Sequence, residues 1–250
     1  MKATFKTDTG KVRRHNEDDG GVFLNQSGHY LAVVADGMGG HNAGEVASQM
    51  AVANLQKHWN EIENIQTPEE AENWLRSKVT DINKDIYNHS KSNSELDGMG
   101  TTLVAAICTN LFATIVNIGD SRCYILNEDG FKQLTEDHSL VNELIKIGHI
   151  SPEDAEIHPR KNMLLKAVGT EPVTEMDIIT ITFEEGDKLL LCSDGLSNKV
   201  TNQELESILQ SDEDIDKKAL TMINLANQNG GEDNISVAII ETCKESGCEQ

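Results

Sequence analysis

The sequence predicts an α+β fold in which two mostly antiparallel β-sheets stack face to face, with a pair of helices on each outer side. Three observations indicate this four-layer α/β/β/α sandwich. Short β-branched runs separated by turn residues are typical of hairpins. Helical patterns occur in two separate pairs along the chain. Helices also do not alternate with single strands, as a doubly wound parallel sheet would require.

The first hairpin leads into a stretch of acid and glycine residues. Val22–Leu24 and Tyr30–Ala35 are apolar runs joined by turn residues, so the two runs should pair. Asp36 follows directly and precedes the glycine-rich Gly37–Gly40, which predicts that the strand ends at Asp36. Asn42 is the predicted N-cap of the helix that comes next.

Two amphipathic helices follow this stretch. The first carries apolar residues at i, i+4 spacing from Ala47 to Trp59. The second begins at Thr67–Glu70, which combines an N-cap, a proline at the first helical position and a capping-box glutamate. Its apolar stripe includes Trp74 and continues to Ile86. Both tryptophans are therefore predicted to lie in the core.

The middle of the chain predicts a meander of strands followed by an insertion. The strands are expected over Thr101–Cys108, Phe112–Ile118, Cys123–Leu126 and Phe131–Leu134. A helix is predicted over Ser139–Ile147, and Ser151-Pro152 starts a shorter one. Because His149–Lys161 is polar and irregular, we expect the segment 139–161 to be a mobile flap.

The last part of the chain completes the pattern of strands and helices. Strands are predicted over Asp177–Phe183, Leu189–Cys192 and Ile235–Ile240, and helices after Thr201 and over Ile215–Asn227. Since no linker or internal repeat interrupts these elements, residues 1–242 are predicted to form a single domain. Residues 243–250 are predicted to be a polar tail.

The composition excludes several classes of partner. The formal net charge of −21 argues against nucleic acid and against an anionic membrane surface, and it is compatible with divalent cations. No apolar run reaches membrane-spanning length and no signal peptide is evident, so we expect a cytoplasmic protein. The cysteines form no Cys-x-x-Cys pair, so we expect reduced, mostly packing cysteines: Cys108, Cys123, Cys192, Cys243 and Cys248.

Aspartates recur beside the ends of the predicted strands. Asp36, Asp120, Asp194 and Asp233 each neighbour a small or turn-forming residue, and a further acidic cluster occupies Asn16–Asp18. Any one of them is also explained as an ordinary turn residue. Together they favour a metal site, since clustered carboxylates repel one another unless cations neutralise them. Mg²⁺ and Mn²⁺ suit a shell of carboxylates and water.

Short polar motifs recur from about Thr7 to Ile240. They are Thr9–Arg13 with Asn16–Asp18, Ala35–His41, Gly98–Thr102, Asn117–Arg122, Asp137–Ser139, Cys192–Leu196 and Gly231–Asn234. Each motif is weak singly, but the ordered set resembles the metal-dependent protein phosphatase family (type 2C). The likeness is greatest to compact bacterial members that oppose serine/threonine kinases. That family's fold, two antiparallel sheets between helix pairs, agrees with the architecture predicted above.

The resemblance implies a set of metal ligands. Asp36 would bridge two ions, either Mn²⁺ or Mg²⁺, and the carbonyl of Gly37 would help to hold one of them. Asp194 and Asp233 would complete the shell of the first ion. Asp18, acting through water, would support the second ion. The resemblance also implies a weaker third ion, held by Asp120 together with Asp194, whereas the alternative for Asp120 is a turn residue paired with Arg122.

Two further residues are candidates for catalysis. Arg13 is the predicted phosphate clamp because a guanidinium fork matches two phosphoryl oxygens, although a surface pair with Glu17 also explains it. The chain has Met38 where many animal members carry a histidine. His41 is therefore the candidate general acid, with a structural role as the alternative. Ser193, although adjacent to Asp194, is interpreted as a packing residue.

The predicted function is hydrolysis of phosphoserine and phosphothreonine in proteins by a water that two metal ions activate. Phosphoprotein substrates, and a bacterial serine/threonine kinase that the enzyme opposes, are the expected partners of a monomeric protein. Two alternatives stay open. One is a catalytically dead binding or sensor domain of the same fold, and the other is a phosphohydrolase of small molecules.

Overall fold

Two antiparallel β-sheets form the inner layers of the computed structural model, which describes residues 1–40 and 42–242. The first sheet has the order β1 (Lys2–Asp8), β11 (Ile235–Glu241), β10 (Lys188–Cys192), β7 (Arg122–Asn127) and β8 (Gly130–Gln133). The second has the order β2 (Asp18–Leu24), β3 (Tyr30–Met38), β5 (Leu103–Cys108), β6 (Phe112–Ile118) and β9 (Asp177–Thr182). A short strand, β4 (Gly100–Thr101), pairs with the end of β3.

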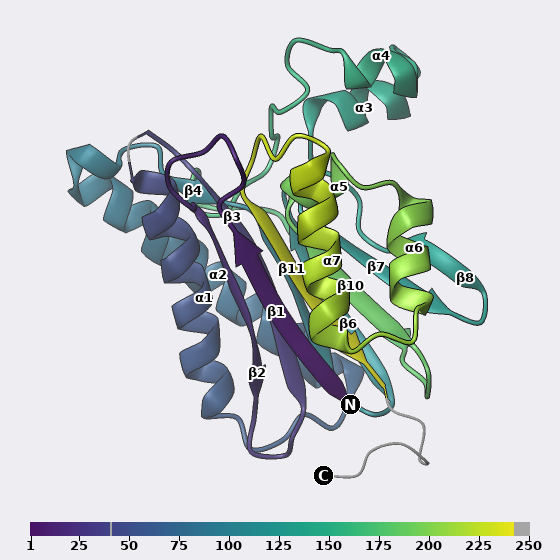
Figure 1. Cartoon of the computed structure of the whole chain (residues 1–250). Helices are drawn as coiled ribbons and strands as arrows, with labels where there is room; N and C mark the ends of the chain where they lie inside the picture. The colour runs from purple at the N-terminus through teal and green to yellow at the C-terminus, as the bar shows by residue number, and fades with distance from the viewer. Residues whose placement is uncertain (41, 243–250) are drawn as a thin grey trace.

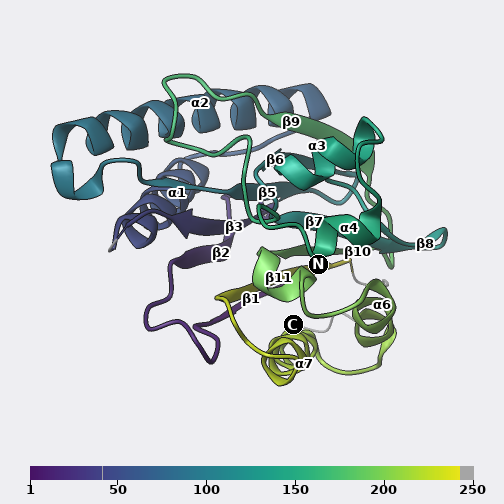
Figure 2. The same cartoon turned by 90° about the horizontal axis from the view of Figure 1, so that it is seen from above.

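Helix pairs form the two outer layers, as Figures 1 and 2 show. Helices α1 (Ala43–Asn60) and α2 (Pro68–Ser92) cover the second sheet, and a 3-10 turn, η1 (Ser94–Leu96), follows them. Helices α6 (Asn202–Gln210) and α7 (Ile215–Gln228) cover the first sheet. The predicted α/β/β/α sandwich is confirmed.

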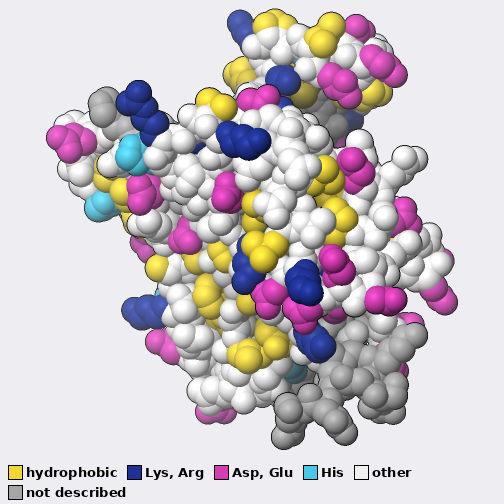
Figure 3. All heavy atoms as spheres, viewed as in Figure 1, with side chains coloured by type: hydrophobic (Ala, Val, Ile, Leu, Met, Phe, Trp, Pro, Cys, Tyr) yellow, Lys and Arg dark blue, Asp and Glu magenta, His cyan; other side chains and the backbone are white. Residues whose placement is uncertain are grey.

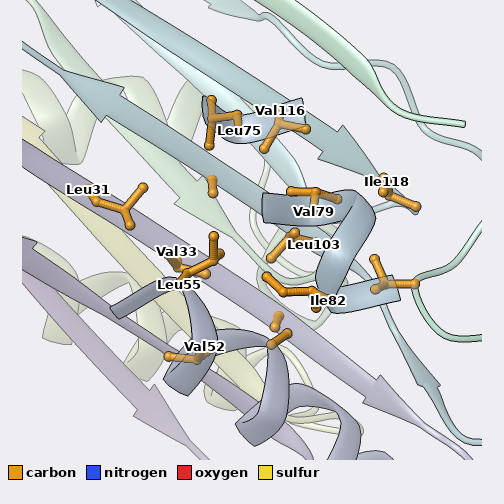
Figure 4. Close-up of a cluster of buried hydrophobic side chains, with 14 of the residues drawn as sticks. Leu31, Val33, Val52, Leu55, Leu75, Val79, Ile82, Leu103, Val116 and Ile118 are labelled. Carbon is orange, nitrogen blue, oxygen red and sulfur yellow. The ribbon is translucent and has the colours of Figure 1, made fainter. Parts of the chain in front are cut away.

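Each interface between layers has its own apolar core. The core under α1 and α2 includes helix residues such as Leu55 and Leu75, which lie beside the strand residues Val33 and Val116 respectively in Figure 4. A second core fills the space between the two sheets, and a third lies under α6 and α7. Successive side chains of a strand point to opposite faces of its sheet. Each sheet can therefore contribute side chains both to the core between the sheets and to the core under its helices.

The helix signals in the sequence give the expected local structures. Thr67 caps α2 in a capping box with Glu70, and Thr201 caps α6 in the same way. The two tryptophans pack edge to face, with ring centroids 5.2 Å apart, in the core under α1 and α2. Asn42 occupies the N-cap position of α1, but its side chain makes no capping hydrogen bond.

One predicted detail of the strands is wrong. Strand β3 does not end at Asp36 but continues to Met38, because β4 supplies hydrogen-bonding partners for the next two residues. Strand β1 pairs with β11 along its whole length. One helical turn, α5 (Asp194–Ser197), follows β10 directly.

A segment containing α3 (Leu140–Lys146) and α4 (Pro152–Glu156) projects from one end of the sandwich (Figure 1). Its two ends are joined at the base. The backbone N–H of Leu140 donates to the carbonyl of Met163 at 2.8 Å, and that of Leu165 donates to the carbonyl of His138 at 2.8 Å. The predicted flap therefore has two short helices and a hydrogen-bonded root.

Charged side chains are distributed over all parts of the face shown in Figure 3. Acidic and basic side chains are both present on this face, including on the projecting segment at the top. Within the part of the chain that the structure describes, every helix is too short or too polar to cross a membrane.

Candidate metal and phosphate site

The aspartates predicted from the motifs meet at the end of the sandwich from which α3 and α4 project. Asp18 opens β2 and lies directly opposite Asp36 of β3 in the strand register. Asp120 follows β6, Asp194 is the first residue of α5, and Asp233 precedes β11. Strand ends from both sheets therefore bring together five acids that are far apart in the sequence.

Asp36 is held in place by its backbone. Its N–H donates to Thr102 Oγ1 at 2.9 Å, and its carbonyl accepts from the N–H of Thr102 at 2.8 Å. The hydroxyl of Thr101 donates to the same carbonyl at 3.0 Å. These three bonds fix the backbone of Asp36, and its side chain interacts with that of Asp194.

Gly37 brings the start of α1 against the end of β3. A Cβ at this position would collide with the backbone of Gly44 and with the carbonyl of Glu17, so only glycine fits. The N–H of Gly37 donates to that Glu17 carbonyl at 3.1 Å. This close approach fixes the 9–17 loop beside Asp36.

Ser193 holds the carboxylate of Asp18, so its interpretation as a packing residue is wrong. Its hydroxyl donates to Asp18 Oδ2 at 2.7 Å and accepts from the N–H of Ser236 at 2.9 Å. Both Asp18 and Ser193 are buried. In the sequence Ser193 is simply the neighbour of Asp194, and no local pattern indicates that its hydroxyl contacts Asp18 of β2.

Asn234 is a second residue whose role the sequence did not reveal. Its Oδ1 accepts from the N–H of Glu17 at 2.8 Å. Its Nδ2 donates to the carbonyls of Thr9 and His15 at 2.9 and 3.0 Å. One side chain thus ties three points of the loop that carries Arg13 to the start of β11.

The clustered carboxylates have raised pKa values. Burial raises the pKa of Asp18 to about 7, with the charges of Asp194 and Asp233 adding to the effect and hydrogen bonds from Ser193 and Ser236 opposing it. Burial, and then the charges of Asp194 and Asp137, raise the pKa of Asp120 to about 7.

The same two causes act on the other central acids. Burial, followed by the charge of Asp18, raises the pKa of Asp36 well above its usual value. Burial and the charge of Asp233 raise the pKa of Asp194. The surrounding protein groups therefore do not offset the cost of ionising these acids, which a bound cation would lower.

Arg13 forms an ion pair with one acid of the cluster. Its Nη2 lies 2.8 Å from Asp233 Oδ2, whereas its Nη1 lies 4.0 Å from Glu17 Oε2. The pairing with Glu17 that served as the alternative explanation is therefore the weaker of two contacts. The guanidinium is largely exposed, so it can reach a ligand above the acids.

Arg122 does not pair with Asp120, so that alternative for Asp120 is wrong. Arg122 binds Asp137 through Nε and Nη2 at 2.7 to 3.1 Å.

Met38 ends β3 and pairs with Gly100 of β4. His41, the predicted general acid, lies outside the described residues, as do Cys243 and Cys248; Cys108, Cys123 and Cys192 are buried and free.

The donor set suits hard divalent cations. Asp18 Oδ1 and Asp194 Oδ1 are buried and have no hydrogen-bond partner among residues 1–40 and 42–242, which is costly unless a cation or water binds them. Asp18 is buried, whereas the other four aspartates keep some exposed surface, as ions exchanging with solvent require. The clustered aspartates offer oxygen ligands, which favours Mg²⁺ or Mn²⁺ over Zn²⁺.

Water must complete any ion shell at this site. Among the described side chains, no three of the His, Cys, Asp and Glu type converge closely enough to hold an ion by themselves. Mg²⁺ ordinarily keeps several water ligands and one or two carboxylates, so separated aspartates fit it. Arg13 contacts Asp233 Oδ2, so a cation on that oxygen would compete with this ion pair.

We expect Ser193→Ala to destabilise the protein and to weaken the Asp18 position. The change leaves Asp18 Oδ2 and the N–H of Ser236 without their partner, which costs about 1–3 kcal/mol in the free energy of unfolding. Urea denaturation measures this loss. Ser197→Ala is the matched control, because the buried Ser197 hydroxyl has no partner among the described residues. Equal stability of the two variants would contradict the assigned role.

Comparisons with known proteins agree with this site. A family model described as protein phosphatase 2C matches residues 11–234. The serine/threonine phosphatase stp of Listeria welshimeri serovar 6b is 52% identical over 241 residues, covering 96% of both chains. A solved bacterial serine phosphatase superposes with a TM-score of 0.91 at 40% identity, covering 98% of this chain and 99% of that one.

A further solved structure contains metal. It is the catalytic domain of the serine threonine protein phosphatase PstP in complex with 2 manganese ions, with a TM-score of 0.84, 32% identity, and coverage of 97% of this chain and 98% of that one. The family model covers most of the chain and includes every aspartate of the cluster. The chain therefore belongs to the protein phosphatase 2C family.

Proposed function

We infer that this member of the family is a metal-dependent phosphatase that acts on phosphoserine and phosphothreonine in proteins. The observation that carries the inference is the cluster of poorly compensated carboxylates around Asp36, set beside an exposed Arg13. Relatives named serine/threonine phosphatase align along nearly the whole chain, which supports the same activity. No observation favours a catalytically dead domain or a phosphohydrolase of small molecules.

The proposed ion ligands are the residues expected from the sequence. Asp36, the carbonyl of Gly37, Asp194 and Asp233 would hold one Mn²⁺ or Mg²⁺. Asp36 and, through water, Asp18 would hold a second ion. Two bound metal ions would lower the pKa of a water that attacks phosphorus, and they would neutralise charge on the phosphoryl group. Asp120 with Asp194 is the proposed site of a weaker third ion.

Arg13 is proposed to orient the phosphoryl group of the substrate. Its exposed guanidinium now pairs with Asp233, and a cation on Asp233 would compete with that ion pair. Released from Asp233, the planar guanidinium presents two parallel N–H groups to phosphoryl oxygens. His41 is proposed to protonate the leaving serine or threonine oxygen, directly or through water, in place of the histidine that Met38 replaces.

The remaining features of the proposal concern the cellular setting. The substrates are proposed to be targets of a serine/threonine kinase, with that kinase among them, and the protein is proposed to act as a cytoplasmic monomer. The projecting segment 139–161 and its neighbouring surface are proposed to contact the substrate protein. The domain is proposed to span residues 1–242, with 243–250 as a tail.

Turnover of phosphopeptides tests the proposed function. With Mn²⁺ or Mg²⁺ we expect release of phosphate from phosphothreonine and phosphoserine peptides, little release from a phosphotyrosine peptide, and none after chelation. Arg13→Ala should raise KM for the peptides. No turnover with Mn²⁺ would support the dead domain, and faster turnover of free phosphometabolites than of phosphopeptides would support the small-molecule enzyme.

A further inference from the structure

His138 joins the turn that carries Asp120 to the root of the projecting segment. The turn, residues 119–121, connects β6 to β7. The N–H of Gly119 donates to His138 Nδ1 at 3.1 Å, and the N–H of His138 donates to the carbonyl of Gly119 at 2.9 Å. The residue before Asp120 is thus held by a reciprocal pair of hydrogen bonds.

The geometry of these bonds determines the tautomer of His138. Because Nδ1 accepts from the N–H of Gly119, this nitrogen carries no proton. The proton of the neutral ring is therefore on Nε2, which donates to Asp177 Oδ2 at 3.1 Å. The imidazole is mostly buried, with 8% of the side chain exposed, so water competes little for either bond.

The backbone of His138 also belongs to the root of the projecting segment. Its carbonyl accepts from the N–H of Leu165 at 2.8 Å, and Ser139 beside it forms a β-bridge with Leu164. Both ends of the segment with α3 and α4 therefore meet at His138. One residue contacts the Asp120 turn with its ring and its N–H, and the returning chain with its carbonyl.

The other side of the Asp120 turn is tied to Asp36. Ser121 Oγ and Thr102 Oγ1 share a hydrogen bond of 2.7 Å, and the same Thr102 oxygen accepts from the N–H of Asp36. Gly119 has a positive φ of 107°, and a Cβ there would collide with Thr102, so the turn has little freedom to adjust. Asp120 therefore lies between the site centre and the root of the projecting segment.

We propose that His138 is a positioning residue, which holds Asp120 ready for a cation and links this position to the root of the projecting segment. The step from Asp120 to cation binding rests on the proposed function. Residues that orient a metal ligand commonly change metal affinity 10- to 100-fold when they are removed. The hydrogen bonds of His138 go to Gly119, Asp177 and Leu165 and to none of the five clustered aspartates, so its effect on Asp120 passes through Gly119.

Substitutions at both ends of the ring separate positioning from general packing. His138→Ala removes the acceptor for the N–H of Gly119, whereas His138→Asn keeps an acceptor oxygen near the position of Nδ1. Asp177→Ala removes the partner that favours the Nε2–H tautomer, and Asp177→Asn retains an acceptor oxygen. His58→Ala is the control. The His58 ring forms a hydrogen bond with the carbonyl of Asn54 in its own helix, near the C-terminal end of α1.

Two measurements test the proposal, and neither needs catalysis. In the metal-free protein, NMR should detect the Nε2–H tautomer of His138, and exchange of the Gly119 amide should be at least about tenfold faster in His138→Ala than in His58→Ala. Mn²⁺ titration, followed by the paramagnetic resonance of free Mn²⁺, should show that the weakest site loses affinity by tenfold or more in His138→Ala. His138→Asn should restore most of both properties.

The outcomes distinguish this proposal from the proposed function. If His138→Ala and His58→Ala have the same amide exchange and the same Mn²⁺ titration, the proposal is overturned. Faster exchange with unchanged Mn²⁺ affinity also overturns it, provided that Asp120→Asn lowers that affinity. If Asp120→Asn leaves the titration unchanged, the proposed third-ion site fails, and with it the link from His138 to a cation, while amide exchange still reports the bond to Gly119.

Discussion

Asp36→Asn is expected to lower kcat/KM for a phosphothreonine peptide by about a thousandfold or more at saturating Mn²⁺, because it removes the carboxylate proposed to bridge two ions. The same change should leave the metal-free protein equally or more stable at pH 8. Burial and neighbouring acids raise the pKa of Asp36, so a neutral amide of similar size removes a repulsive charge. Peptide turnover and thermal unfolding measure the two effects.

A control on the surface makes this result specific. Asp81 is exposed on α2, and Asp81→Asn should change neither the activity nor the melting temperature. Loss of activity in Asp36→Asn together with a lower melting temperature would point to misfolding. Retention of more than a tenth of the wild-type kcat/KM would show that Asp36 is not the bridging ligand.

Stability of the metal-free protein should fall as pH rises from about 4 to about 7. Asp18 and Asp120 have folded-state pKa values of about 7, against 3.8 for the ordinary group. Within this window the folded state binds more protons than the unfolded state, so the free energy of unfolding decreases with pH. Each group contributes up to about 1.4 kcal/mol per pH unit. Above this window both states are ionised and the penalty is constant.

Divalent metal should reverse this trend, since a cation favours the ionised carboxylates. We expect Mn²⁺ to raise the melting temperature more at pH 8 than at pH 5, where protons compete for the same oxygens. Urea denaturation at pH 5, 6.5 and 8, with Mn²⁺ and with chelator, measures both effects. Asp18→Asn and Asp120→Asn should each flatten the metal-free profile. A flat profile in the unsubstituted protein would mean that burial and the neighbouring acids do not raise the pKa values of Asp18 and Asp120.

The fold was largely predictable because its signals are local. The capping boxes at Thr67 and Thr201 and the turn residues between apolar runs specify where elements begin and end. The strand β3 was predicted too short because its last two residues depend on β4, which lies more than sixty residues later. The pattern of apolar and turn residues around Asp36 does not indicate a pairing strand that far along the chain.

The acids of the candidate site could be predicted from the sequence, but the residues that hold them could not. The aspartates were found from their repeated place beside strand ends, and their order along the chain resembled one family. Ser193 and Asn234 were not assigned a role, although both hold the acids and the Arg13 loop by hydrogen bonds across the two sheets. Residue types as common as Ser and Asn carry no such information until their neighbours in space are known.

By itself the sequence determined the class of the fold, the family and the set of acids, because periodicity, turn chemistry and ordered motifs are written along the chain. Only the tertiary structure decided which groups hold those acids. In the structure Arg13 pairs with Asp233, Arg122 pairs with Asp137, and His138 forms a hydrogen bond with the turn that carries Asp120. The physical reason is that hydrogen bonds and ion pairs depend on distances of about 3 Å between residues far apart in sequence.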